Sequence, residues 1–232
     1  MAGVIPWSWS MLESYETCPK QFYEEKIAKS VSPDTDSAYL VWGNEVHKAF
    51  ELTIGQGVPF PERMKQWEHI AYRCRDIEGD KYVENKLAVN GRLQACGFWD
   101  KDAWNRGLDD FIVVKGSKAI TIDWKTGKPK EGSGQLETSA ARIMAKFPEV
   151  NEVHSAFAWL AVGKWTRGVF VRANYNQIWE SYYSRIERML WSMQHNTWPA
   201  KPSGLCKRSK KPGSTYMGCR VTNCPHSENY KK

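Results

Sequence analysis

Apolar side chains recur at helical spacing in several stretches of the chain. Near the start, Met11, Tyr15, Cys18 and Phe22 are spaced at i, i+4, i+7 and i+11, which places them on one face of a helix. Helical spacing, together with a cap at Ser8 or Ser10, Gly55 after the second stretch and Pro148 after the fourth, predicts five helices. They cover residues 8–27, 38–54, 62–77, 135–146 and 175–195.

Short runs rich in β-branched and aromatic residues lie between these helices and predict strands. They cover residues 81–89, 92–98, 107–115, 118–125, 152–161 and 166–173. The order of the elements predicts an α/β or α+β fold, in which a central mixed sheet is flanked by helices. The periodic pattern stops near residue 196. We therefore expect residues 1–196 to form the core with an N-terminal helical region, and residues 197–232 to form a basic, cysteine-containing tail packed on it.

The composition is that of a globular protein. Of the 232 residues, 41% are hydrophobic, 13% aromatic and 25% charged, which excludes collagen-like and wholly disordered chains. No apolar run approaches the roughly 18 residues of a membrane span, and the start of the chain has no secretory signal pattern. We therefore expect a cytoplasmic protein without a membrane partner. Its six cysteines should then be thiols or metal ligands and not disulfides.

Charge is distributed unevenly along the chain. Residues 161–232 carry 13 Lys and Arg against 3 Asp and Glu, whereas residues 1–160 carry 20 against 23. A basic segment beside a mildly acidic body is typical of proteins that bind polyanions. The twelve Trp and ten Tyr residues also include candidates for stacking on unpaired bases, although most should belong to the core. A tail that merely improves solubility is the alternative explanation of the charge.

Two strand-like runs on either side of Gly116 and Ser117 carry the most informative side chains. Gly followed by Ser fits a two-residue type II′ turn, so the runs should form a hairpin in which opposed residue numbers sum to 233. In that register Asp110 lies directly opposite Asp123, with Cβ atoms about 5 Å apart. Like charges at this distance repel each other, and a hard divalent cation such as magnesium would neutralise them.

Strand alternation adds a third side chain to this candidate site. Asp123 and Lys125 should point to one face of the strand, and Ile122 and Trp124 to the other. A lysine two residues from a metal-binding carboxylate can help to deprotonate water or stabilise the charge on an attacked phosphate. The same register places Asp109 on the opposite side, so it is not expected to join the site.

The second predicted helix supplies a candidate ligand of a different kind. Gly43, His47 and Glu51 are spaced at i, i+4 and i+8 and form a stripe beside an apolar face. Neutral imidazole can join carboxylates on a catalytic metal ion, although a single histidine of this kind is more often simply packed and hydrogen-bonded. Glu51 could orient His47 or be solvated. Glu84, early in the first strand, could also face the site, but we do not count it among the expected ligands.

Recognisable motifs follow one another in order along the chain. It opens with SWSMLESYETCPKQFYEEKI, continues with GNEVHKAFE and RGLDDFIVV, and then contains TIDWKTGK and GQLETSAARI. Together these segments resemble the PD-(D/E)XK nuclease superfamily, specifically its RecB-like branch, which includes CRISPR-associated exonucleases and many phage nucleases. The resemblance covers most of the chain and implies that residues 1–196 form a restriction-endonuclease-like nuclease core.

The resemblance implies a role for each matching residue. It implies metal ligands at His47, Asp110, Asp123 and the backbone carbonyl of Trp124. It makes Lys125 the catalytic lysine and gives Gln135 the task of placing the substrate and that lysine, so that the catalytic group consists of Asp110, Asp123, Lys125 and Gln135. The chain departs from the pattern at Ser139, where many relatives have Tyr, which leaves the handling of the DNA strand open.

The implied activity is hydrolysis of DNA phosphodiester bonds by water activated on magnesium or manganese. An exonuclease that acts in DNA recombination, repair or processing fits the resemblance best. The implied partners are single-stranded DNA or duplex DNA with an end, and proteins of recombination or replication; a phage origin also fits. The alternative is a nucleic-acid-binding module, or a subunit that depends on a partner, with a metal-stapled basic tail and no nuclease activity of its own.

Four cysteines are distributed in a way that is typical of a shared metal. Cys18 lies on the first predicted helix, whereas Cys206, Cys219 and Cys224 lie in the tail. Relatives with an iron–sulfur cluster use one cysteine from the first helix and three from the C-terminus, so the resemblance implies a 4Fe–4S cluster here. The alternatives are a structural zinc ion, held by the three tail cysteines with Cys18 or His226, and a Cys18 that is simply a core residue.

Overall fold

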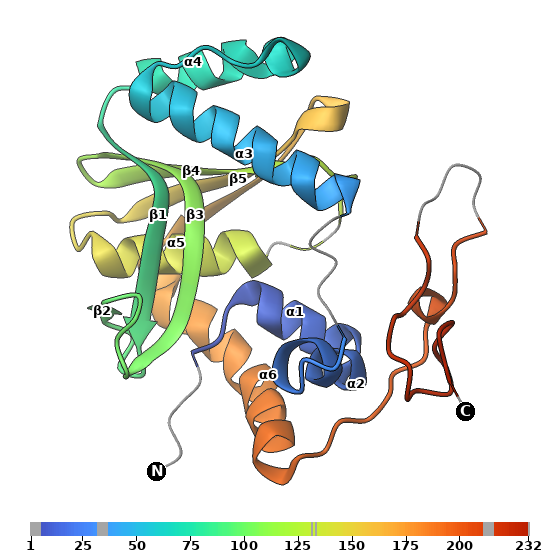
Figure 1. Ribbon diagram of the computed structural model, residues 1–232. Coiled ribbons are helices and arrows are strands. Elements are labelled where there is room, and N and C mark those ends of the chain that lie inside the picture. The colour runs from blue at the N-terminus through green and yellow to red at the C-terminus, as the bar shows by residue number, and fades with distance from the viewer. Residues whose placement is uncertain (1–5, 32–36, 131, 133, 211–215, 232) are drawn as a thin grey trace. The chain divides into compact units, whose positions relative to one another are not determined.

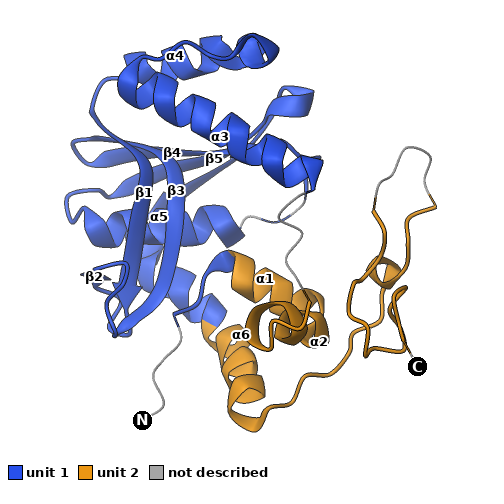
Figure 2. Cartoon of the chain, in the orientation of Figure 1, with its two compact units in different colours: residues 1–9, 35–182 blue, residues 10–34, 183–232 orange. Residues whose placement is uncertain are grey.

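The computed structural model of the chain divides into two compact units (Figure 2). It describes residues 6–31, 37–130, 132, 134–210 and 216–231. The first unit comprises residues 1–9 and 35–182, and the second comprises residues 10–34 and 183–232. Each unit therefore joins segments that are far apart in the sequence. The division into a core of residues 1–196 and a tail of residues 197–232 stays a prediction. No helix within the described ranges is long and apolar enough to cross a membrane.

The first unit is built on a six-stranded sheet with the strand order β2-β1-β3-β4-β5-β6 (Figure 1). Neighbouring strands are antiparallel except β4 and β5, which are parallel and are connected through the helix α5. The predicted mixed sheet flanked by helices is thus confirmed. The strands are β1 (Asp80–Asn90), β2 (Ala95–Cys96), β3 (Ala103–Lys115), β4 (Lys118–Lys125), β5 (Glu152–Trp159) and β6 (Lys164–Val171).

Helices cover both faces of this sheet (Figure 1). α3 (Ala38–Gln56) and α4 (Glu68–Asp76) pack on one face, and α5 (Gly134–Lys146) packs on the other. On the first face the rings of Phe50 and Trp124 stack with centroids 4.0 Å apart, so α3 is held directly against β4. The last long helix, α6 (Tyr175–His195), has the predicted bounds. Short helical turns lie at Glu62–Trp67, Leu160–Val162, Arg172–Asn174 and Gly204–Cys206.

The ends of α3 have clear local causes. The Ser37 hydroxyl accepts a hydrogen bond from the backbone N–H of Leu40 and caps the first turn. The helix ends two residues later than predicted, at Gly57 instead of Gly55, because Gly57 adopts the left-handed φ of 73° that stops a helix. The apolar pattern could not distinguish between these two glycines.

The first predicted helix is divided into three pieces in the structure. They are α1 (Trp9–Thr17), α2 (Pro19–Phe22) and a π-helical turn, η1 (Tyr23–Ile27). Cys18 is extended, with φ of −162° and ψ of 106°, because the ring of the following Pro19 disfavours the helical conformation at the residue before it. Cys18 is therefore at a helix break and not on a continuous helical face.

A buried carboxylate connects the N-terminal segment of the second unit to the tail. Glu24 is 3% exposed and lies 2.7 Å from the ammonium group of Lys20. Its carboxylate also accepts hydrogen bonds from Ser30 and, at 2.9 Å, from the Asn223 amide. Burial by itself would raise the pKa of Glu24, but these three partners outweigh burial and lower its pKa from 4.5 to about 2.

The pH dependence of the free energy of unfolding tests the contribution of the Glu24 carboxylate. Because the folded pKa of Glu24 is depressed, its stabilising effect is complete above the unfolded value of 4.5 and is lost as the pH falls toward 2. We expect Glu24→Gln to lower the free energy of unfolding at pH 7 by about 1.5–3 kcal/mol, the usual range for hydrogen bonds to a charged group. Urea denaturation should show this difference narrowing by pH 3, whereas the exposed Glu13→Gln should show little difference at either pH.

Candidate functional site

The β3–β4 hairpin turns at Gly116, and its register is the predicted one. The paired ladder runs only as far as Phe111 and Ile122, one step short of Asp110 and Asp123. The two carboxylates are therefore not partners in the ladder, which corrects the expected direct opposition. Beyond the last ladder pair, the Asp110 carboxylate accepts the backbone N–H of Trp124 at 2.8 Å.

Adjacent carboxylates of β3 reach opposite faces of the sheet. Asp109 contacts α5, where its carboxylate lies 3.2 Å from the guanidinium of Arg142 and accepts a hydrogen bond from Ser139. Asp110 contacts α3, where its Oδ2 lies 3.2 Å from Nδ1 of His47. Asp109 is thus directed away from Asp110 and is neutralised by a partner of its own. The predicted register put Asp109 on the side of Trp124, and this was wrong, because Trp124 packs against α3 and Asp109 against α5.

A third acidic residue joins His47 and Asp110. Single ligand atoms of His47, Glu84 and Asp110 all lie within 4.8 Å of one another. Glu84 has a left-handed φ of 49°, and β1 pairs with β3 on either side of it, through Val83–Phe111 and Asn85–Asp109. The sequence did not identify Glu84 as an expected ligand, because its place early in a strand says nothing of this irregular backbone.

The charges of this cluster perturb one another. Burial and the neighbouring Asp110 raise the pKa of Glu84 to about 6. Burial would lower the pKa of His47, but the bond to Asp110 and the nearby carboxylates of Asp123 and Glu84 outweigh it and raise that pKa. Repulsion between these carboxylates therefore destabilises the site, and a positive charge placed among them would relieve it.

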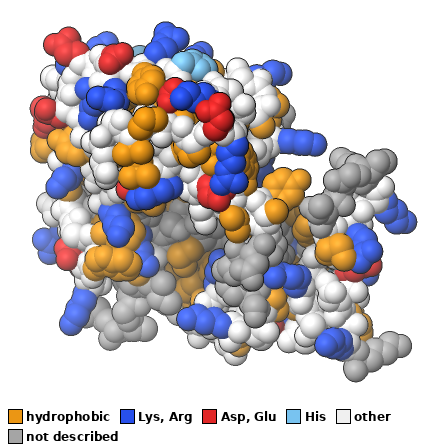
Figure 3. Space-filling model, turned by 45° about the horizontal axis from the view of Figure 1, so that its top comes forward, with side chains coloured by type: hydrophobic (Ala, Val, Ile, Leu, Met, Phe, Trp, Pro, Cys, Tyr) orange, Lys and Arg blue, Asp and Glu red, His pale blue; other side chains and the backbone are white. Residues whose placement is uncertain are grey.

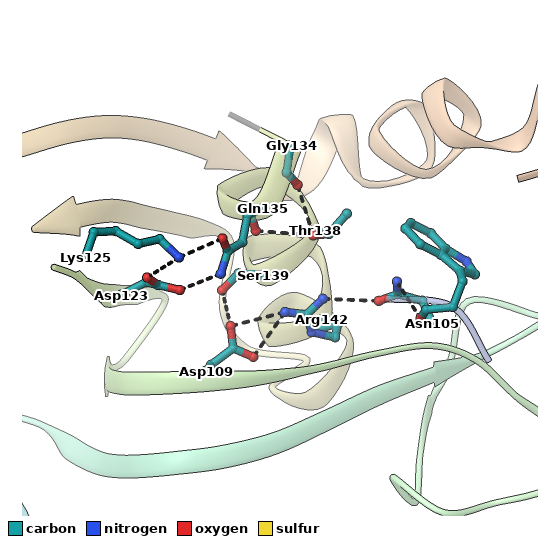
Figure 4. A network of polar contacts seen from close by, with 10 residues as sticks. Asn105, Asp109, Asp123, Lys125, Gly134, Gln135, Thr138, Ser139 and Arg142 are labelled. Carbon is teal, nitrogen blue, oxygen red and sulfur yellow. Dashed lines mark hydrogen bonds and ion pairs between the residues drawn. The ribbon is translucent and has the colours of Figure 1, made fainter. Parts of the chain in front are cut away.

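The other half of the site links β4 to α5 (Figure 4). The ammonium group of Lys125 lies 2.7 Å from Asp123 and donates to Oε1 of Gln135 at 3.0 Å. The Gln135 amide in turn donates to the other oxygen of Asp123. The Lys125 ammonium nitrogen also lies 4.9 Å from the ring centroid of Phe157, a cation–π contact. Burial and Asp110 raise the pKa of Asp123, although Lys125 opposes them.

The donors present suit a hard divalent cation. Carboxylate oxygens of Glu84, Asp110 and Asp123 and an imidazole nitrogen of His47 are the ligand types that magnesium and manganese accept. The negative charge of Asp110 contributes to the raised pKa of Asp123 on the neighbouring strand. The site is partly open, since the side chain of His47 is 33% exposed.

Two further sequence-predicted residues have clear positions. The Trp124 ring is 2% exposed and lies in the core against Phe50, so only its backbone is near the carboxylates; the role of its carbonyl as a ligand stays a prediction. Glu51 binds Lys48 through both carboxylate oxygens at 2.8 Å. This ion pair explains the position of the Glu51 carboxylate, so no role in orienting His47 is needed to explain it.

A buried polar network supports the back of the site (Figure 4). Arg142 of α5 is 3% exposed; besides the ion pair with Asp109, it donates to the side-chain oxygen of Asn105 at 3.2 Å. Gly107 makes room for this guanidinium, because a Cβ atom at that position would lie only 2.3–2.8 Å from its atoms. A glycine three residues before Asp110 thus has a steric reason in this chain. Sequence reasoning did not identify Arg142.

Adding a methyl group at Gly107 should displace Arg142. We expect Gly107→Ala to lower the free energy of unfolding by about 1–3 kcal/mol, as overpacking in a filled interior does. Urea denaturation would measure the loss. Gly91→Ala is a matched control, since a Cβ atom there has no heavy atom within 4 Å. Equal stabilities of the two variants would contradict the steric role of Gly107.

The four cysteines singled out from the sequence lie together in the second unit. Cys18, Cys206, Cys219 and Cys224 line one small pocket, which His226 also borders. Backbone N–H groups donate to two of the sulfur atoms, from Lys201 to Cys18 at 3.5 Å and from Ser203 to Cys206 at 3.4 Å. Among the described residues, no three of these sulfur atoms lie within 4.8 Å of one another. A tetrahedral zinc site would bring them to about 3.8 Å.

Comparison with known proteins supports the fold assignment. No family model and no protein of curated function matches the chain. Among solved structures, a protein named "Putative exonuclease" from Eubacterium rectale is similar over 92% of both chains, with 13% identity and a TM-score of 0.52. A protein named SSO0001 matches 78% of this chain and 75% of its own, with 13% identity and a TM-score of 0.43. The mixed sheet with its flanking helices is thus a restriction-endonuclease-like fold.

Proposed function

We propose that the protein is a metal-dependent nuclease of the RecB-like PD-(D/E)XK kind, which hydrolyses DNA phosphodiester bonds and acts most readily at DNA ends. The observation that carries this proposal is the cluster of His47, Glu84 and Asp110, to which the nearby pair of Asp123 and Lys125 is electrostatically coupled. The similarity to the Eubacterium rectale protein supports the proposal, because that protein is named "Putative exonuclease".

In this proposal the side chains have separate tasks. His47, Asp110 and Asp123 would hold the cation, and Glu84 would complete its oxygen ligands. When bound, magnesium or manganese would lower the pKa of water and offset the charge of the attacked phosphate. Lys125 would contribute positive charge next to that phosphate.

Gln135 is a positioning residue in this proposal. Its amide holds Lys125 and Asp123 at the same time, so it fixes the direction in which the ammonium group points. Ser139, where relatives often have Tyr, binds Asp109 instead of facing the opening of the site. We therefore do not propose Ser139 as a residue that contacts the DNA strand.

The test is cleavage of DNA with and without an end. The purified protein would be incubated with end-labelled single-stranded and double-stranded DNA and with closed circular DNA, in magnesium, manganese or EDTA. We expect metal-dependent loss of linear DNA, no loss of circular DNA and no loss in EDTA. A protein that binds DNA but cleaves none of these substrates would instead be the binding module or partner-dependent subunit.

We further propose that the four clustered cysteines hold a metal centre, with a 4Fe–4S cluster as the first choice. Support comes from the shared pocket and from the N–H groups that donate to the sulfur atoms of Cys18 and Cys206, since such bonds stabilise metal-bound thiolates. The centre would tie the tail to the segment around Cys18.

Metal analysis of anaerobically purified protein distinguishes the possible metals. We expect about four iron atoms per chain, a brown colour, and loss of both in Cys206→Ser. Cys96→Ser is the matched control, because Cys96 belongs to β2 and does not line this pocket. One zinc ion per chain would establish the structural zinc alternative, and wild-type protein without either metal would overturn the centre.

A further inference from the structure

A strip of exposed side chains extends from the carboxylate cluster along β1 and β3. Strand pairing places Lys86 beside Leu108 on the face opposite Gly107, which is the face that Asp110 and Glu84 share. Leu108 is 45% exposed, and Lys86 is exposed as well. The sheet beyond the cluster is thus open to solvent on the face where the reaction would take place.

Two aromatic rings stand at the far end of this strip. Phe98 and Trp99 lie in the loop between β2 and β3, with centroids 4.9 Å apart and an interplanar angle of 82°. The guanidinium carbon of Arg106 lies 5.3 and 5.2 Å from the two centroids, and the Lys86 nitrogen lies 5.9 Å from each. Trp99 nevertheless remains 73% exposed. Figure 3 shows that basic and hydrophobic side chains adjoin on the visible face of the molecule.

The loop that carries Trp99 is held in one conformation. The Asp100 carboxylate accepts the backbone N–H of Gly97 at 2.7 Å, and the Asp100 N–H donates back to the Gly97 carbonyl at 3.0 Å. The Ala103 N–H then donates to the Asp100 carbonyl at 3.2 Å. The Asp100 carboxylate is therefore hydrogen-bonded within the turn. These hydrogen bonds support the backbone that carries the Trp99 ring.

We propose that Trp99, flanked by Lys86 and Arg106, is a stacking subsite for an unpaired nucleobase of the strand being processed. An exposed aromatic ring beside cations is the chemistry that binds single strands, since the ring stacks on the base and the cations bind phosphate. Arg106 and Asp110 are four positions apart on β3, about 13 Å at the rise of a strand. That distance spans about four stacked nucleotides. The subsite rests on the proposed nuclease function and adds a single-stranded substrate to it.

Binding without cleavage tests the subsite. Fluorescence anisotropy in EDTA would compare wild type and Trp99→Ala on 12-nucleotide single strands, each with one abasic site at a successive position from the end. We expect Trp99→Ala to weaken binding of the intact strand about fivefold or more. In wild type, an abasic site at one position of the strand should weaken binding by a similar factor. An abasic site at that position should not weaken binding to Trp99→Ala any further. Trp99→Phe should keep most of the affinity.

The chain offers a closely matched control. Trp165 is a partly exposed tryptophan with an arginine over its ring, Arg167 at 5.6 Å, but it lies on β6 at the other edge of the sheet. Trp165→Ala should bind like wild type. Unchanged affinity in Trp99→Ala, an equal loss in Trp165→Ala, or an equal loss on blunt duplex would overturn the subsite. Because this assay needs no hydrolysis, a failure of the nuclease proposal would be seen separately in the cleavage test.

Discussion

Replacing Lys125 with Met should lower the rate of DNA cleavage by about 10²–10³-fold, the usual cost of removing one group that stabilises transition-state charge. The ammonium group is held between Asp123 and Gln135, so its position does not depend on substrate. Asp123→Asn should cause at least as large a loss, because it removes a ligand oxygen charge as well as the partner of the lysine. Initial rates on end-labelled DNA in magnesium or manganese would measure both effects.

A lysine at the other end of the same strand provides the control. Lys118 begins β4 and forms an ion pair with Glu152, and its side chain is 66% exposed. Lys118→Met should cleave DNA at the wild-type rate. Lys125→Met and Asp123→Asn should still bind DNA in EDTA and give wild-type circular dichroism spectra. Full cleavage by both purified variants would refute the assignment of the active site.

Breaking the ion pair between Arg142 and Asp109 should cause the largest loss of stability. Both side chains are 4% exposed, so Arg142→Met would leave the charge of Asp109 buried with only Ser139 and no cation. Removing one partner of a buried pair typically costs about 3–5 kcal/mol of the free energy of unfolding. Urea denaturation monitored by circular dichroism should show this as a lower midpoint with an unchanged slope.

A double substitution distinguishes the ion pair from simple packing. Replacing both charges, in Asp109→Leu with Arg142→Met, should restore much of the stability because no unpaired charge remains. Lys115→Met, which breaks an exposed pair with Glu78, should leave the urea midpoint nearly unchanged, because solvent screens exposed ion pairs. Additive losses in the double variant would show that the two side chains do not stabilise each other.

This network also explains how one strand serves both faces of the sheet. Arg142 and Ser139 hold Asp109 against α5, and the next residue, Asp110, is thereby directed to His47 on α3. The register counted from the turn predicted Asp110 directly opposite Asp123. This prediction was wrong because it assumed that the ladder continues, whereas the ladder ends at Phe111.

The sequence by itself determined the features that depend on neighbouring residues. Apolar periodicity is a local property, and it located α6 and the mixed sheet correctly. The two-residue turn at Gly116 and Ser117 is also local, and it predicted the correct hairpin register. Short motifs of the family resemblance likewise indicate His47, Asp123, Lys125 and Gln135. Local pattern also contained the reason for the break at Cys18, since Pro19 follows it, although periodicity alone predicted a continuous helix.

Only the tertiary structure decided which of these residues meet. Glu84 joins His47 and Asp110 because its φ is positive and the β1–β3 ladder is irregular there, and no local pattern predicts such a conformation. The role of Arg142 follows only from the packing of α5, which places its guanidinium in the space beside Gly107. These contacts join residues that are distant in the chain, and their energies depend on burial and on opposing charges. Both arise only once the sheet and its helices have assembled.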